Sequence, residues 1–166
     1  MLIILSYLES VDLLYSCNTF DSRRTDAVLR LPSVMLPHRM QQLRRLQFST
    51  AFSCLKPRGP QWELPPGRPA DFWCLPDDRR QWAATCEILA SLQHLEYARF
   101  TIILQCQNNR HGHPETEARL LCELLRPLKA VRCSQFIVKV ARSMEILQEE
   151  LGATPFRLRL CETPVC

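Results

Sequence analysis

The sequence predicts an α/β fold, a short curved layer in which mainly parallel strands alternate with helices. Segments with apolar residues at three- and four-residue spacing, typical of helices, are followed by segments in which apolar and polar residues alternate, typical of strands. The connections between successive strand segments are long enough for a crossover, which makes consecutive strands run parallel. An open α/β sandwich is the alternative architecture.

Length and composition indicate one domain, spanning residues 1–166. A chain of 166 residues with 46% hydrophobic content lies within the usual range for a single core. Residues 50–80 differ in composition, because six prolines and two glycines fall in this segment. Proline interrupts both helices and central strands, so we expect a proline-rich surface loop here.

The N-terminal part predicts a helix that docks on the core, then short elements. The apolar residues of the helix recur at helical spacing, and they are Leu5, Leu8, Val11, Leu14 and Tyr15. A short strand is expected at Thr19 and Phe20. A helix within residues 21–36 should break at Pro32, and the next strand should cover residues 44–49.

Residues 82–104 predict the central unit, one helix followed by one strand. The helix should bury Trp82, Cys86, Leu89 and Leu92. Leucines spaced by three residues before a strand are typical of leucine-rich repeats, so we expect a leucine-rich-repeat-like layer, although the strands are too unevenly spaced for true repeats. Two shorter helix and strand pairs should follow, with strands at 135–140 and 156–160 and with Gly152 ending the last helix.

The two faces of the predicted strands differ in charge. If the phenylalanine side of each strand packs on the helices, the opposite side presents a basic strip made of Arg45, Arg99, Lys139, Arg157 and Arg159. Two interpretations remain open. The strip is either a solvated face whose edge charges discourage strand pairing, or a surface that binds an acidic peptide or protein.

Several function classes find no support in the sequence. A net charge of +4 is well below the positive charge typical of nucleic-acid-binding proteins. The aromatic residues fall on the apolar side of the strands, where they cannot stack on nucleic-acid bases. No glycine-rich phosphate loop and no activated nucleophile is evident. We therefore expect no enzyme, no cofactor, no nucleic acid and no small-molecule substrate.

The cysteines and the N-terminal segment predict an intracellular protein, cytoplasmic or nuclear. Nine cysteines are an odd number, and no pair has the C-x-x-C spacing of zinc or redox motifs. We expect reduced thiols that serve as small apolar residues. The opening apolar segment is too short to cross a bilayer and meets Glu9 and Asp12, so neither a signal peptide nor a membrane partner is expected.

The segment 106–113 is the alternative site. Cys106, His111 and His113 supply a thiolate and two imidazoles that a loop can bring around one metal ion. No fourth ligand is evident. A metal-binding protein or an enzyme centred on this segment is therefore the second hypothesis.

A resemblance to a known family rests on four segments, which are Tyr7 to Tyr15, Asn18 to Phe20, Leu36 to Arg39 and Leu43 to Phe48. They resemble the Y-x-E-A-x-x-L-L-Y-x-x-N-T-F, I-L-P-x-R and I-R-x-L-x-L motifs of a fungal domain-of-unknown-function family that is often described as F-box-like. Ser10 replaces the usual alanine, and a fainter similarity extends over residues 82–104.

This resemblance implies a fold and an interaction role, but no reaction. It suggests the partner-recognition part of an F-box-like adaptor. Because the chain starts almost at the first motif, we expect a truncated or alternatively started N-terminus.

Overall fold

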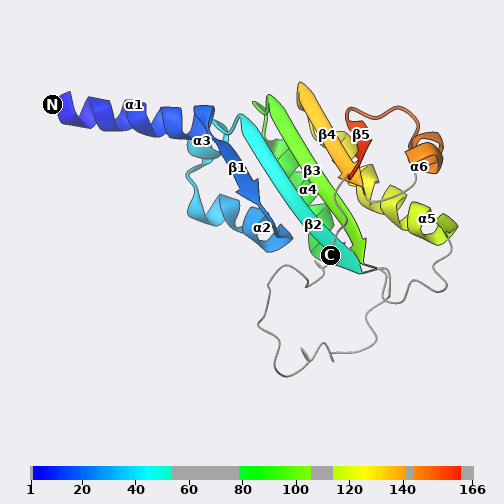
Figure 1. The fold of residues 1–166 in the computed structure, drawn as a ribbon. Helices are drawn as coiled ribbons and strands as arrows, with labels where there is room; N and C mark the ends of the chain where they lie inside the picture. Colours follow the sequence, from blue (N-terminus) through cyan, green and yellow to red (C-terminus); the bar gives the residue numbers. More distant parts are fainter. Residues whose placement is uncertain (1, 54–78, 106–113, 141–143, 162–166) are drawn as a thin grey trace, which may run out of the picture.

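The computed structural model describes residues 2–53, 79–105, 114–140 and 144–161, which build a five-stranded sheet with a layer of helices on one face (Figure 1). The elements in chain order are α1 (Leu2–Cys17), β1 (Thr19–Ser22), α2 (Thr25–Val34), α3 (Pro37–Met40), β2 (Arg45–Ser53), α4 (Arg79–Ser91), β3 (Tyr97–Gln105), α5 (Pro114–Leu125), the 3₁₀ helix η1 (Arg126–Ala130), β4 (Gln135–Val140), α6 (Met144–Leu151) and β5 (Arg157–Leu160).

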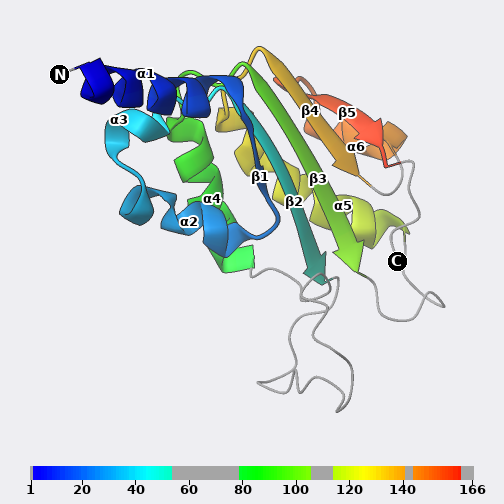
Figure 2. The ribbon, with the colours of Figure 1, turned by 60° about the vertical axis from the view of Figure 1, so that its left-hand side comes forward.

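The strand order is the chain order, β1-β2-β3-β4-β5, and every neighbouring pair is parallel. Crossovers between parallel strands are right-handed, so a sheet that grows in one direction places its crossover helices on the same face. Figure 2 shows α2, α4, α5 and α6 on that face, with the opposite face of β2 and β3 turned to the viewer. The predicted α/β class with parallel strands is confirmed.

Phenylalanines on the helix side of β2, β3 and β4, and one directly before β5, form a continuous aromatic ladder. Phe48, Phe100, Phe136 and Phe156 contact one another in series, with ring centroids 5.6, 5.0 and 5.4 Å apart in edge-to-face geometry. Edge-to-face pairs at this spacing add about 0.5–1.5 kcal/mol each beyond the burial of their area. The ladder therefore joins β2 to β5 across the core.

The central helix α4 packs as its sequence pattern predicts, with Trp82, Cys86 and Leu89 buried. The indole Nε1 of Trp82 donates a buried hydrogen bond of 2.8 Å to the carbonyl of Leu124, which fixes α4 against α5. Gly152 has a φ of +60°, the left-handed conformation predicted at the end of α6, where an L side chain would be strained.

The prediction that α1 docks along its length is wrong for Leu14, whose side chain is 51% exposed. Tyr15 alone of the predicted stripe packs against the core within the described side chains, stacking on Phe20 at 5.6 Å. α1 lies where the strands begin and extends past the β1 edge, because α2 fills the place beside β1 in the helix layer (Figure 1). The side chains of Leu5 and Leu8 lie outside the described residues.

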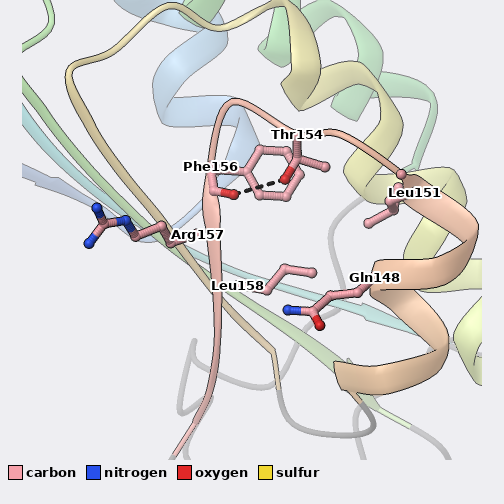
Figure 3. Close-up of a pocket in the computed structure, with 7 residues that line it drawn as sticks. Gln148, Leu151, Thr154, Phe156, Arg157 and Leu158 are labelled. Carbon is pink, nitrogen blue, oxygen red and sulfur yellow. Dashed lines mark hydrogen bonds between the residues drawn. The ribbon is translucent and has the colours of Figure 1, made fainter.

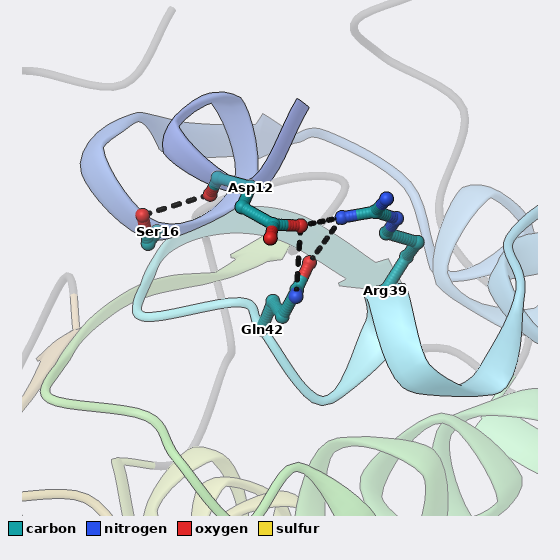
Figure 4. A network of polar contacts seen from close by, with 4 residues as sticks. All are labelled: Asp12, Ser16, Arg39 and Gln42. Atoms are coloured by element: carbon teal, nitrogen blue, oxygen red, sulfur yellow. Dashed lines mark hydrogen bonds and ion pairs between the residues drawn. The ribbon is translucent and has the colours of Figure 1, made fainter. Parts of the chain in front are cut away.

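A polar cluster ties the end of α1 to α3 (Figure 4). Asp12 forms an ion pair with Arg39 and accepts a hydrogen bond of 3.1 Å from Gln42. Arg39 also donates to the side-chain oxygen of Gln42 at 3.0 Å, and the Ser16 hydroxyl donates to the carbonyl of Asp12 at 2.8 Å. Two segments that carry the family resemblance thus meet in a structural contact.

Two predicted boundaries differ from the structure. α2 does not break at Pro32 but continues to Val34, since the exposed proline ring faces solvent and only the last turn follows it. β2 extends to Ser53, into the predicted loop, because Phe52 is fully buried against Trp82, with ring centroids 5.4 Å apart. Most of the proline-rich segment, residues 54–78, lies outside the described residues.

Candidate functional site

The face of the sheet opposite the helices carries the predicted basic residues. Pairing registers place Gln47, Arg99, Ile137 and Arg157 in one row across β2 to β5, and Thr101, Lys139 and Arg159 in the next row. Arg45 lies on the same side of β2 as Gln47, two residues before it. In the part of the chain that the structure describes, no helix lies on this face (Figure 1).

The structure brings all five predicted cations onto one surface, which we call the basic strand face: Arg45, Arg99, Lys139, Arg157 and Arg159. Lys139 stands directly opposite Arg159 on the neighbouring strand. Arg99 and Arg157 lie two strands apart in one row, which corresponds to about 10 Å between their backbones. Like charges placed opposite one another repel, so this arrangement costs some stability.

Neutralising groups are scarce on this face. Among the described strand residues, Asp21 is its one carboxylate, and it lies on β1 within 3.6 Å of Arg23. None of the five cations forms an ion pair or a side-chain hydrogen bond with another described residue. The basic strand face is therefore positive, and the described residues around it do not compensate its charge.

Arg99 is the most constrained of the five cations. Its Nε is buried and has no hydrogen-bond partner among the described residues, although a buried N–H without a partner is costly. Its guanidinium lies over the ring of Tyr97, 5.6 Å from the ring centroid. The ring holds the cation in place by its quadrupole, and the terminal N–H groups form no hydrogen bond with a described residue.

Sequence reasoning missed Tyr97 and the apolar part of this face. Tyr97 precedes Arg99 by two residues and so shares its side of β3, a signal that strand alternation contains. Ile137 lies between Arg99 and Arg157 in their row, and Ile103 lies further along β3. Cations beside half-buried apolar side chains are typical of protein-binding surfaces more than of purely solvated ones.

Two thiols in the helix layer, Cys86 and Cys122, are buried and are not activated for chemistry. Burial raises the pKa of the Cys86 thiol from its ordinary value of 9.0 to about 12, and burial with a hydrogen bond to Glu150 raises the pKa of Cys122 to about 11. Because the thiolate is the nucleophile, neutral buried thiols are unreactive. Both residues fill the interface between helices and sheet.

The metal hypothesis concerns residues that the structure does not describe. Cys106, His111 and His113 all lie in the segment 106–113, outside the described ranges. Within the described ranges, no group of three or more histidines, cysteines or acidic residues is placed to hold a metal ion. The alternative site at 106–113 stays a prediction.

Searches with the whole chain point to one family. A family model described as a domain of unknown function, DUF7730, matches residues 4–160. No curated protein and no solved structure matches. Of the helices in the described ranges, none is long and apolar enough to cross a membrane.

Proposed function

Because this chain belongs to DUF7730, a domain family of unknown function, we propose a function from its geometry: it is a non-enzymatic protein-interaction module. In this proposal the basic strand face binds an acidic surface or segment of a partner protein. Arg99 and Tyr97 form the fixed centre of the contact, and the cations of β4 and β5 surround it.

The single observation that carries the proposal is the held position of Arg99, whose buried Nε has no hydrogen-bond partner among the described residues and whose guanidinium lies over Tyr97. A solvated arginine extends its guanidinium into water and satisfies every donor there. Arg99 instead lies along the sheet over Tyr97, with one donor already out of water. A carboxylate that pairs with the terminal N–H groups of this held guanidinium costs little side-chain entropy on binding, which favours binding over simple exposure.

Electrostatics also support an acidic partner. The chain has a net charge of only +4, yet five cations that form no ion pair with a described residue share one face, so the positive potential is local. A local field of this kind steers an acidic partner and raises its association rate without attracting polyanions in general. The partner proposed is a protein rather than a nucleic acid, since the strand phenylalanines are buried and Tyr97, on the basic strand face, already lies under Arg99.

A charge-reversal experiment tests the proposal. The variant carries Arg99→Glu, Lys139→Glu and Arg157→Glu, and the matched control reverses three exposed arginines away from the basic strand face, Arg30, Arg126 and Arg132. Both variants change net charge from +4 to −2, because each reversal removes two charges, three times over. Affinity capture with quantitative mass spectrometry should show specific partners lost with the first variant and retained with the control.

Two outcomes contradict the proposal. An unchanged partner list for the first variant, at an unchanged melting temperature, means that the basic strand face is only solvated. Tight binding of random single-stranded nucleic acid by the unmodified chain, falling steeply with salt, assigns the face to phosphates instead of protein carboxylates.

The family resemblance extends the proposal to an adaptor. An F-box-like role requires that the protein bind a ubiquitin-ligase linker protein in addition to its acidic partner. Co-purification of the linker with full-length protein, in both the reversed and the control variants, supports this extension because recruitment then uses a separate surface. Failure of full-length protein to retain the linker removes the adaptor role and leaves the interaction module.

The alternative function is metal binding at 106–113. Elemental analysis of purified protein, compared with a His111→Ala and His113→Ala double variant, decides it. About one zinc per chain in the unmodified protein, absent from the double variant, supports a metal site. Absence of zinc from both proteins ends this alternative.

A further inference from the structure

The β5 strand forms the C-terminal edge of the sheet, with β4 as its neighbour on one side and no other described strand beside it. The N–H of Cys161 donates to the carbonyl of Val140 at 2.8 Å. Along a strand in a parallel sheet, alternate residues direct N–H and C=O to opposite sides. The backbone N–H and C=O groups of residues 159 and 161 therefore point toward β4, while those of Leu158 and Leu160 point toward the open edge.

These backbone groups form a short pairing site. Within the described part of the chain, neither Leu158 nor Leu160 forms a hydrogen bond on this side. The carbonyl of Phe156, two residues earlier, already accepts a hydrogen bond of 2.8 Å from the Thr154 hydroxyl. The free edge therefore begins at Leu158, where an added strand finds donors and acceptors ready for a ladder.

A pocket lies beside this edge, on the helix side (Figure 3). It has a volume of about 280 Å³ and is lined by residues of α6, the following turn and β5, including Gln148, Leu151, Phe156 and Leu158. This volume is near the lower limit of roughly 300–1,000 Å³ for small-molecule sites and is large enough to hold an apolar side chain of a peptide. Leu160 continues the apolar side along the edge and is 52% exposed.

The other side of the same edge is basic. Arg157 and Arg159 are exposed on the open face, and Figure 3 shows Arg157 pointing away from Phe156, Leu158 and the pocket. A strand added to β5 alternates its own side chains between the same two sides. Charge complementarity therefore requires apolar residues toward the pocket and acidic residues toward the two arginines.

We propose that the β5 edge binds an extended segment of the partner protein, in which acidic residues alternate with apolar ones, by strand addition. This inference rests on the proposed function and names the partner's chemistry and its binding mode. Backbone hydrogen bonds to Leu158 and Leu160 supply pairing, the pocket selects the apolar residue, and Arg157 and Arg159 select the acidic ones.

A second copy of the chain fits this edge less well. Another β5 brings its own Arg157 and Arg159 beside these two, and like charges repel. The opposite edge, β1, offers Asp21 as a single acidic side chain, already within 3.6 Å of Arg23. One engaged carboxylate does not match two arginines, so a partner segment with successive acidic residues is the better occupant.

Fluorescence anisotropy with synthetic peptides tests the proposal. The probe is a labelled peptide of about six residues, the usual strand length, alternating glutamate and valine. One control peptide replaces each glutamate by lysine, and a second has the probe's composition with the residues in two blocks. Unmodified protein should bind the alternating acidic peptide, while a protein with Arg157→Glu and Arg159→Glu should prefer the lysine peptide.

The backbone contribution is tested separately with Leu160→Pro. Proline removes the outward N–H of residue 160, keeps the Cys161 to Val140 hydrogen bond available, and is tolerated on edge strands. Loss of one main-chain hydrogen bond should weaken binding about tenfold. If this variant unfolds, a second experiment uses unmodified protein and two versions of the probe peptide, each N-methylated at alternate amides. Methyl groups on the amides that face β5 should abolish binding, and methyl groups on the other amides should not.

Several results overturn the inference. Equal affinity for the block and alternating peptides, or no saturable binding, excludes strand addition. If Leu160→Pro binds the peptide fully and the arginine double variant does not, the basic strand face binds the peptide without strand pairing. That result excludes strand addition but leaves the proposed function unchanged. Self-association in light scattering that Leu160→Pro abolishes identifies a second copy as the occupant.

Discussion

Replacing Arg99 by lysine should stabilise the fold while keeping the charge. In lysine, the methylene Cε takes the place of the arginine Nε, the buried atom that has no described partner. The ammonium nitrogen then takes the place of the guanidinium carbon, which lies 5.6 Å from the centre of the Tyr97 ring. The substitution therefore removes the unsatisfied donor and retains the cation–π contact.

The expected gain in stability follows from the free-energy cost of burying an N–H donor without a hydrogen-bond partner. An unsatisfied buried N–H costs about 1–3 kcal/mol, so Arg99→Lys should raise the free energy of unfolding by about 1 kcal/mol or more. Arg99→Met also removes the donor but loses the cation–π contact, and should gain about 0.5–1 kcal/mol less. For a chain of this size, each kcal/mol shifts the melting temperature by about 2–4 °C.

Urea unfolding followed by circular dichroism measures these differences, with Arg45→Lys as the control. Arg45 is exposed on the same face, so its replacement should change stability by less than about 0.5 kcal/mol. Partner binding should fall with Arg99→Met, which lacks the cation. If Arg99→Lys is no more stable than the unmodified chain while the control is unchanged, the Nε has a partner in solution, and the reasoning for the basic strand face is refuted.

Three further predictions concern the core and the N-terminal helix. Trp82→Phe removes the donor to Leu124 and should lower the free energy of unfolding by about 1–3 kcal/mol in urea titrations; an unchanged value contradicts the buried hydrogen bond. Asp12→Asn weakens the ion pair between its exposed carboxylate and Arg39 by less than about 1 kcal/mol, so amide exchange should quicken in the last turns of α1 alone. Because burial raises the pKa of Cys86 from 9.0 to about 12, this thiol should lower stability between these pH values, by at most about 1.4 kcal/mol per pH unit. Cys86→Ala should therefore show a shallower fall in stability, and the part that remains up to about pH 11 comes from Cys122, whose pKa is also raised.

Local periodicity explains what the sequence could predict. The alternation of Phe100 with Arg99 and Thr101 assigns both faces of β3 once one face is known to be apolar, and the structure places Phe100 in the core. The same alternation predicted that all five residues of the basic strand face lie on one side of the sheet. Period-two alternation needs no knowledge of distant neighbours, because every strand of a one-sided sheet obeys it.

Contacts between distant segments explain what the sequence could not predict. The helical pattern of α1 identifies an apolar stripe, but not whether a neighbour covers it, and Leu14 is exposed since α2 occupies the adjoining position. The end of β2 depends on Trp82, which buries Phe52 from a helix far along the chain. The pairing site on β5 depends on strand order and register, which composition does not contain.

The aromatic ladder has a consequence for how the chain unfolds. In arrays whose units contact only their neighbours, units can unfold one at a time from an end. Phe48, Phe100, Phe136 and Phe156 interlock in series, so loosening one strand exposes a ring of the next, and β2 to β5 should melt as a single cooperative step. β1 lies outside this series, and unfolding should begin from the α1 end.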